Sequence, residues 1–81
     1  MENKTYKIVN TLTLAGELSD SAKHRIGRTG KIVRLIKGRG FKFLYDATGL
    51  MLKTSIVEDI EISRDIIRIE TLNTVYILQE V

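Results

Sequence analysis

β-Branched residues dominate the apolar positions of this chain, and they constrain its fold more than any other feature of the sequence. Eleven Ile, five Val and eight Thr make 24 β-branched residues among 81. Such side chains lose rotamer freedom in a helix but pack well on a pleated sheet. The sequence has no proline, so glycine must supply the breaks between apolar runs. We therefore expect an all-β fold whose turns are marked by its six glycines.

The apolar runs predict six or seven short strands. We expect an N-terminal strand over residues 6–14, a meander over 31–36, 41–46 and 50–54, a short strand at 60–62, and a closing hairpin over 66–71 and 74–79. Residues 55–59 are expected to form a bend or a single turn. The segment 15–29 fits either a helix of at most two turns or an irregular loop. Strands of this number and spacing are typical of a small barrel or sandwich.

The hairpin over residues 31–46 is predicted in more detail, because its loop length decides which side chains share a face. A three-residue loop, with Gly40 in the left-handed conformation, would pair Leu35 with Phe43. Arg34 and Lys42 would then face outward, whereas Val33, Leu35, Phe41 and Phe43 would face the core. A loop of two or four residues would instead place Arg34 among the aromatic side chains, and burial of an unpaired guanidinium is costly. We therefore favour the three-residue loop.

That register would leave Ile32, Ile36 and Leu44 on the outer face, which would be half apolar. We expect this face to be covered by a partner or by the segment that carries Leu18, Ala22 and Ile26.

Length and composition limit the classes of protein. Eighty-one residues without cysteine suffice for one β-barrel domain over residues 1–81, stabilised by packing rather than by disulfides. The N-terminal residues lack the apolar core of a signal peptide, and no apolar run approaches the roughly 20 residues that span a bilayer. We expect a cytoplasmic protein with no membrane partner, and its oligomeric state is left open.

Charge is distributed very unevenly along the chain. Residues 23–42 carry eight cations and no acid, residues 1–22 have a net charge of −1, and residues 43–81 have a net charge of −4. The overall charge of +3 therefore conceals a basic block followed by an acidic half. Such asymmetry is expected of a nucleic-acid binding surface, in which Lys and Arg replace the counterions of phosphates.

The predicted function is that of a non-enzymatic binding module that holds a nucleic-acid backbone, RNA or DNA, with low specificity. The residues predicted to bind it are Arg28, Lys31, Arg34, Lys37, Arg39 and Lys42. The alternative is a protein–protein interaction module, for example a small phage-type regulator of a host protein, which would use an acidic partner, the half-apolar face or the edge of the closing hairpin. A further alternative is that the acidic half of the chain simply neutralises the basic block.

Other chemistry has little support in the sequence. Residues 27–31 resemble part of a phosphate-binding loop, but Ile32 stands where Ser or Thr should bind magnesium. His24 has no cysteine or acidic cluster near it in the sequence, and the acids at 58, 59 and 61 lack the spacing of a calcium loop. We predict no catalytic residue, no metal site and no cofactor.

Part of the chain resembles a known family. The run from Gly30 through Ile32 to Leu35, a strand that ends near Asp46, Gly49, and the segment 53–61 resemble an SH3-like barrel of the KOW type, over about residues 24–62. In that family a Gly-x-Val-x-x-Ile strand begins a five-stranded barrel whose last strand follows a helical turn. The resemblance implies a small SH3-like barrel, here with an added N-terminal strand and C-terminal hairpin and at most one short helix. It also implies a module that binds RNA or protein, and no catalytic residue.

A second resemblance concerns the whole chain. The segments LKTSIVEDIE and IETLNTVYIL are similar to stretches of small uncharacterised proteins carried by phages and prophages of low-GC Gram-positive bacteria. No functional motif accompanies this similarity.

Overall fold

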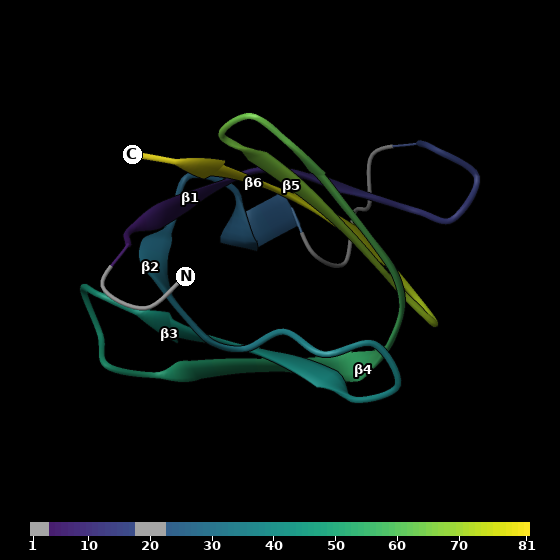
Figure 1. The fold of residues 1–81 in the computed structure, drawn as a ribbon. Coiled ribbons are helices and arrows are strands. Elements are labelled where there is room, and N and C mark those ends of the chain that lie inside the picture. The colour runs from purple at the N-terminus through teal and green to yellow at the C-terminus, as the bar shows by residue number, and fades with distance from the viewer. Residues whose placement is uncertain (1–3, 18–22) are drawn as a thin grey trace.

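The computed structural model describes residues 4–17 and 23–81, and their six strands form a closed antiparallel ring (Figure 1). The strands are β1 (Tyr6–Leu12), β2 (Thr29–Arg34), β3 (Gly40–Tyr45), β4 (Met51–Ser63), β5 (Ile66–Thr71) and β6 (Val75–Glu80). Each strand pairs with the next, and β1 closes the ring by pairing with both β2 and β6. The predicted all-β barrel is therefore confirmed, and the N-terminal strand and the C-terminal hairpin are both part of the ring.

Helical structure in the described part of the chain is limited to one 3₁₀ turn, η1 (Lys23–Arg25). The sequence left a short helix or a loop open for residues 15–29, and the described ends of that segment fit the loop. Leu18 and Ala22, two of the residues expected to cover the outer face, lie outside the described residues. Within residues 4–17 and 23–81, no helix has the length and apolar character needed to cross a membrane.

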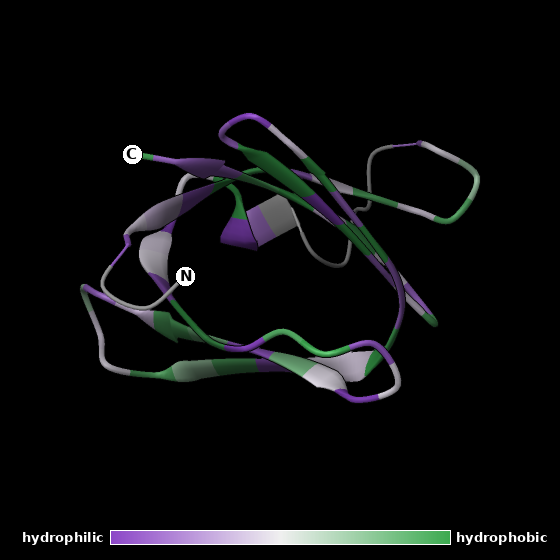
Figure 2. Ribbon diagram, in the orientation of Figure 1, coloured by the Kyte–Doolittle hydropathy of each residue, from purple (hydrophilic) through white to green (hydrophobic). Residues whose placement is uncertain are grey.

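The core lies inside the ring and receives buried or partly buried residues from every strand. Phe41, Phe43, Ile8, Ile69 and Leu78 are completely buried. The two phenylalanine rings lie 5.8 Å apart between centroids, an ordinary packing distance for aromatic pairs. In Figure 2 the most hydrophilic residues gather in the turns and in η1, whereas apolar residues recur along the strands. The β-branched residues thus lie mainly in strands that have one buried face, as expected.

β4 is one strand of 13 residues, so the prediction of a bend at 55–59 followed by a separate strand at 60–62 is wrong. Its first half pairs with β3, from Met51 to Ile56, and its second half pairs with β5, from Val57 to Ser63. Both ladders contain a β-bulge. Bulges increase local twist and bend a strand without ending it, so one strand serves both halves of the barrel.

The β2–β3 hairpin differs from its predicted register. Ile32 lies opposite Phe43 and Arg34 opposite Lys42, with a bulge between the two pairs. The loop spans residues 35–39, and the positive φ belongs to Gly38 (90°) rather than to Gly40. The Arg39 amide donates to the Ile36 carbonyl at 3.1 Å, which is the bond expected of a turn with glycine in its third position.

The altered register corrects some side-chain positions and confirms others. Val33 is 52% exposed, contrary to the prediction, and Ile32 instead packs against the core. Arg34 shares a face with Lys42, and Phe43 is buried, as predicted. Ile36 is 55% exposed, so the apolar part of this face is not fully covered by the described residues.

Two glycines lie within strands, which corrects the expectation that all six mark turns. Gly30 belongs to β2, and a Cβ placed there would meet the backbone carbonyl oxygen of Leu44 and come within 2.8 Å of the Phe43 ring. Gly40 begins β3, where a Cβ would lie 2.6 Å from the Thr54 carbonyl oxygen. These glycines allow neighbouring strands to approach closely.

Candidate nucleic-acid interface

Cross-strand register brings three cations into one row on the outer face of the barrel. Arg34 in β2 lies opposite Lys42 in β3, and Lys42 lies opposite Lys53 in β4. Because Phe41 and Phe43 on either side of Lys42 are fully buried, Lys42 and its cross-strand partners face outward. Neighbouring strands are about 4.8 Å apart, so the row crosses three strands within about 10 Å. We call Arg34, Lys42 and Lys53 the cationic row.

The loop tip extends this row with two more cations. Lys37 and Arg39 are exposed there. The loop is fastened to β4, because the Gly38 amide donates to the Val57 carbonyl at 2.9 Å and the Val57 amide donates to the Arg39 carbonyl at 2.9 Å. Figure 1 shows the loop between β2 and β3 lying against β4. The tip is therefore a fixed part of the cationic surface.

Arg34 also has a structural role in this hairpin. Its Nε and Nη2 atoms donate to the Gly40 carbonyl oxygen at 3.1 and 3.0 Å. This carbonyl stands at the start of β3, so the guanidinium ties the two ends of the loop together. Some of its five donors are used in this way, and the charge stays on the outer face.

The other two predicted site residues lie apart from the hairpin tip. Lys31 lies 3.9 Å from the Asp46 carboxylate, and both side chains are about half exposed, so this ion pair contributes little free energy. Arg28 lies over the ring of Tyr45, with its Cζ atom 4.8 Å from the ring centroid. The structure thus groups four of the six predicted residues at the hairpin, keeps Lys31 at its base, and assigns Arg28 to a different site.

Sequence reasoning missed Lys53. It stands in an acid-rich half of the chain, and only its register opposite Lys42 brings it to the basic surface. The alternation of exposed Lys53 with buried Leu52 was a usable signal, but the signal required the pairing of β3 with β4 to be known.

Acidic side chains of the described residues are largely separated from the cationic row. The ion pairs among the described residues join Lys4 to Glu80 at 3.3 Å, Lys31 to Asp46 at 3.9 Å and Arg68 to Glu70 at 3.4 Å, and none of them includes a residue of the cationic row. The acids at 58, 59 and 61 lie on the half of β4 that pairs with β5, whereas Lys53 lies on the half that pairs with β3. Glu58 directly follows Val57, to which the loop is hydrogen-bonded, so this acid lies beside the loop tip rather than beside the cationic row. Among the described residues, Lys31 is the one member of the predicted site that forms an ion pair with the acidic half.

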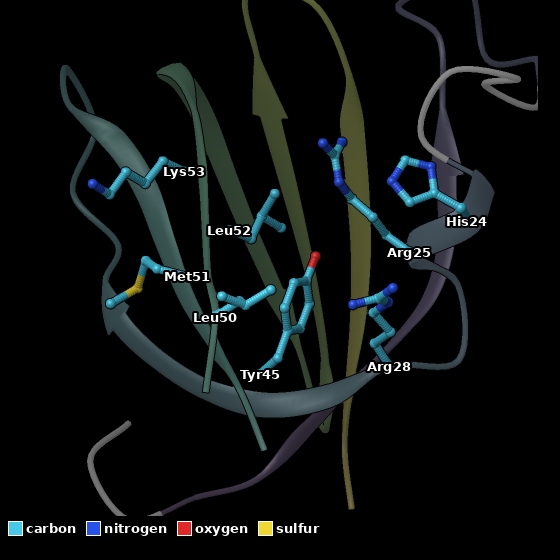
Figure 3. A pocket seen from close by; sticks show the side chains of 8 residues that line it. All are labelled: His24, Arg25, Arg28, Tyr45, Leu50, Met51, Leu52 and Lys53. Atoms are coloured by element: carbon cyan, nitrogen blue, oxygen red, sulfur yellow. The ribbon is translucent and has the colours of Figure 1, made fainter. Parts of the chain in front are cut away.

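A second cationic site is a cleft of about 340 Å³ between η1 and the start of β4, which we call the η1 cleft. Its described lining contains four basic side chains and no carboxylate; the residues are His24, Arg25, Arg28, Tyr45, Leu50, Met51, Leu52 and Lys53. Figure 3 shows the Met51 and Lys53 side chains pointing away from the two arginines. The positive charge that faces the η1 cleft therefore comes chiefly from Arg25 and Arg28.

Tyrosine side chains hold both arginines of the η1 cleft. Arg25 Nη1 donates a hydrogen bond to the hydroxyl oxygen of Tyr76 at 3.2 Å. Arg28 stacks on Tyr45, which is only 8% exposed and therefore offers a fixed ring face. Both guanidinium groups are thus positioned without a carboxylate from the described residues.

The pH dependence of stability tests the burial of the Tyr76 hydroxyl beside Arg25. Burial raises the pKa of the Tyr76 hydroxyl above its ordinary value of 10.0, although the nearby Arg25 charge acts in the opposite direction. A raised pKa in the folded state means that the unfolded chain releases this proton first, so its contribution to stability is complete below pH 10 and is lost as the pH rises above it. We expect the wild type to lose more stability than Tyr76→Phe between pH 9 and about pH 11, as measured by urea unfolding. Parallel loss in both proteins would contradict this prediction.

The described residues contain no group of three or more His, Cys, Asp or Glu side chains that could hold a metal ion. Comparison with protein-family models, with curated proteins and with solved structures gave no significant match.

Proposed function

We propose that this protein is a non-enzymatic module that binds the phosphate backbone of nucleic acid with little sequence preference. The binding surface consists of the cationic row and the loop tip. The observation that carries the proposal is the register that places Arg34, Lys42 and Lys53 side by side across three strands.

The cationic row is difficult to explain by stability alone. Like charges placed directly opposite each other on neighbouring strands destabilise a sheet. Here two such pairs are adjacent, because Lys42 faces a cation on each side. A polyanion laid across the row would relieve this repulsion and release its own counterions. Departures from the local rules of strand pairing are expected at functional sites.

Low specificity follows from what the surface offers to a nucleic acid. All five aromatic side chains of the sequence are buried in the described structure, at 8% exposure or less, so none forms an open stacking platform. The described residues also provide no helix to enter a major groove. Contacts to phosphates position a protein on nucleic acid without reading its sequence.

The test removes two charges from the cationic row and compares the variant with one that loses two charges elsewhere. Lys42→Gln/Lys53→Gln removes two cations from the row but leaves Arg34, which holds the loop. The matched control, Lys7→Gln/Arg64→Gln, alters exposed residues of β1 and of the β4–β5 turn and causes the same change in net charge. Binding is measured by fluorescence anisotropy with labelled single-stranded RNA, single-stranded DNA and duplex.

The slope of log K against log salt concentration is negative. We expect its magnitude to be smaller by about 1.4 to 1.8 in the row variant, Lys42→Gln/Lys53→Gln, because each phosphate contact contributes about 0.7 to 0.9 to that magnitude. The control variant should keep the wild-type slope. Circular dichroism checks that both variants are folded.

Two outcomes would contradict the proposal. Equal weakening in both variants would show that net charge alone matters. No binding by the wild type at 50 mM salt and micromolar protein would leave a protein partner as the remaining class, to be sought by light scattering and by pull-down with and without nuclease. The predicted edge of the closing hairpin would not be its contact, since β5 and β6 are each paired on both sides.

A further inference from the structure

We propose that the η1 cleft binds the phosphate monoester group of a nucleotide. The two arginines that carry this site, Arg25 and Arg28, lie outside the cationic row and the loop tip, so the proposal stands independently of the backbone-binding proposal. Lys53 borders both sites, but its side chain points away from the two arginines (Figure 3). Two positioned guanidinium groups face a cleft whose described lining contains no carboxylate.

The charge and donor geometry of the η1 cleft match a phosphate monoester. Such a group carries close to two negative charges at neutral pH and offers three acceptor oxygens. Arginine presents several donors in a fixed plane, which suits phosphate recognition better than a lysine does. Arg25 spends one donor on Tyr76, and Arg28 is held by stacking on Tyr45, so each retains N–H groups for a ligand.

The positions of both arginines are set in advance. Tyr76 is 4% exposed and belongs to the core, so its hydroxyl fixes Arg25 relative to the barrel. A side chain already held in place loses less conformational entropy when a ligand binds. Figure 3 shows the Tyr45 hydroxyl pointing into the space between Leu50 and Leu52 on one side and the arginines on the other. Tyr45 therefore places a further polar group near the proposed phosphate.

The size and lining of the cleft indicate that the ligand is larger than a bare phosphate ion. A volume of about 340 Å³ is near the lower end of the range for small-molecule pockets, which begins at about 300 Å³. Leu50 and Leu52 form an apolar wall beside the arginines. Arg28 and Tyr45 also line a second cleft of about 400 Å³. A phosphorylated nucleotide, free or at the 5′ end of a chain, supplies both a dianionic group and an organic body.

The test uses isothermal titration calorimetry with a nucleoside 5′-monophosphate and the matching nucleoside. We expect the monophosphate to bind and the nucleoside to bind at least about tenfold more weakly, because hydrogen bonds to a charged group are the stronger kind. Arg28→Gln, at an exposed position, and Arg25→Gln/Arg28→Gln should each weaken monophosphate binding by at least about tenfold. Arg39→Gln, at the loop tip, is the matched control for one lost charge and should leave it unchanged.

A second pair of ligands distinguishes the two sources of the phosphate. An oligonucleotide with a 5′-phosphate is compared with the same oligonucleotide with a 5′-hydroxyl, using the Lys37→Gln/Lys42→Gln protein to weaken backbone binding without changing the lining of the η1 cleft. Tighter binding of the 5′-phosphate form assigns the site to chain ends, and equal binding assigns it to free nucleotides.

Three results would overturn the inference: no monophosphate binding at millimolar concentration, equal binding of nucleoside and monophosphate, or unchanged binding by Arg28→Gln. Lys37→Gln/Lys42→Gln, which changes no lining residue of the η1 cleft, is expected to retain monophosphate binding. Failure of one proposal therefore leaves the other intact and identifiable.

Discussion

Raising the salt concentration from 50 to 200 mM is expected to weaken nucleic-acid binding by this protein about 50-fold to 150-fold, if about four phosphates are neutralised. The four cations are Lys37 and Arg39 at the loop tip and Lys42 and Lys53 in the row. Arg34 is left out of this number because its guanidinium already serves the Gly40 carbonyl oxygen. The range reflects the difference between single strands, with a slope of about 0.7 per phosphate, and duplexes, with a slope of about 0.9.

The measurement is an anisotropy titration at four or more salt concentrations, with protein concentration and probe length held constant. A single-stranded probe and a duplex of equal length allow the two slopes to be compared within one experiment. An affinity that does not change with salt would show that the cationic row is not the binding surface, even if binding itself is observed.

Replacement of Gly30 by alanine is expected to remove a large part of the protein's stability. The new Cβ would meet the Leu44 carbonyl oxygen and the Phe43 ring, and the carbonyl belongs to the backbone of β3, so it cannot move without displacing the strand. We expect a loss of about 3 kcal/mol or more, at the upper end of the usual cost of overpacking. A domain of this size has a total stability of only several kcal/mol, about 0.05 to 0.15 kcal/mol per residue.

The control for this substitution is Gly49→Ala. Gly49 lies in the turn between β3 and β4 with a φ of 70°, and a Cβ there would meet nothing within 4 Å. The expected cost is that of the left-handed conformation alone, about 1 to 2 kcal/mol. Urea unfolding followed by circular dichroism compares the two variants. If Gly30→Ala lost no more stability than Gly49→Ala, the close approach of β2 to β3 would be disproved.

Local patterns determined much of the fold. The β-branched composition indicated an all-β barrel, and the closing hairpin was predicted within one residue of β5 and β6 at every end. Alternation correctly indicated the buried Phe41 and Phe43, because burial along a strand follows a period of two wherever one face packs on a core. The basic block was also visible, because net charge depends on composition alone.

The remaining features depended on contacts between residues far apart in the sequence. The segment from Ser55 to Asp59 was expected to bend, but pairing of Val57 with Thr71 and of Asp59 with Glu70 keeps it in β4. The bulge beside Val33 shifts the hairpin register by an amount that no local pattern indicates. Gly30 was expected in a turn. The sequence could not show that it lies within a strand, because the carbonyl oxygen that excludes a side chain there belongs to β3.

The candidate sites divide in the same way. The sequence by itself determined the cations of the hairpin, since they follow one another within a single segment. Only the tertiary structure placed Lys53 beside Lys42 and brought Arg25 to Tyr76, 51 residues away. The physical reason is that the sign of a charge is a property of one residue, whereas a binding site requires several side chains at fixed distances. Those distances are set by strand register and by closure of the barrel, which join residues that are far apart in the chain.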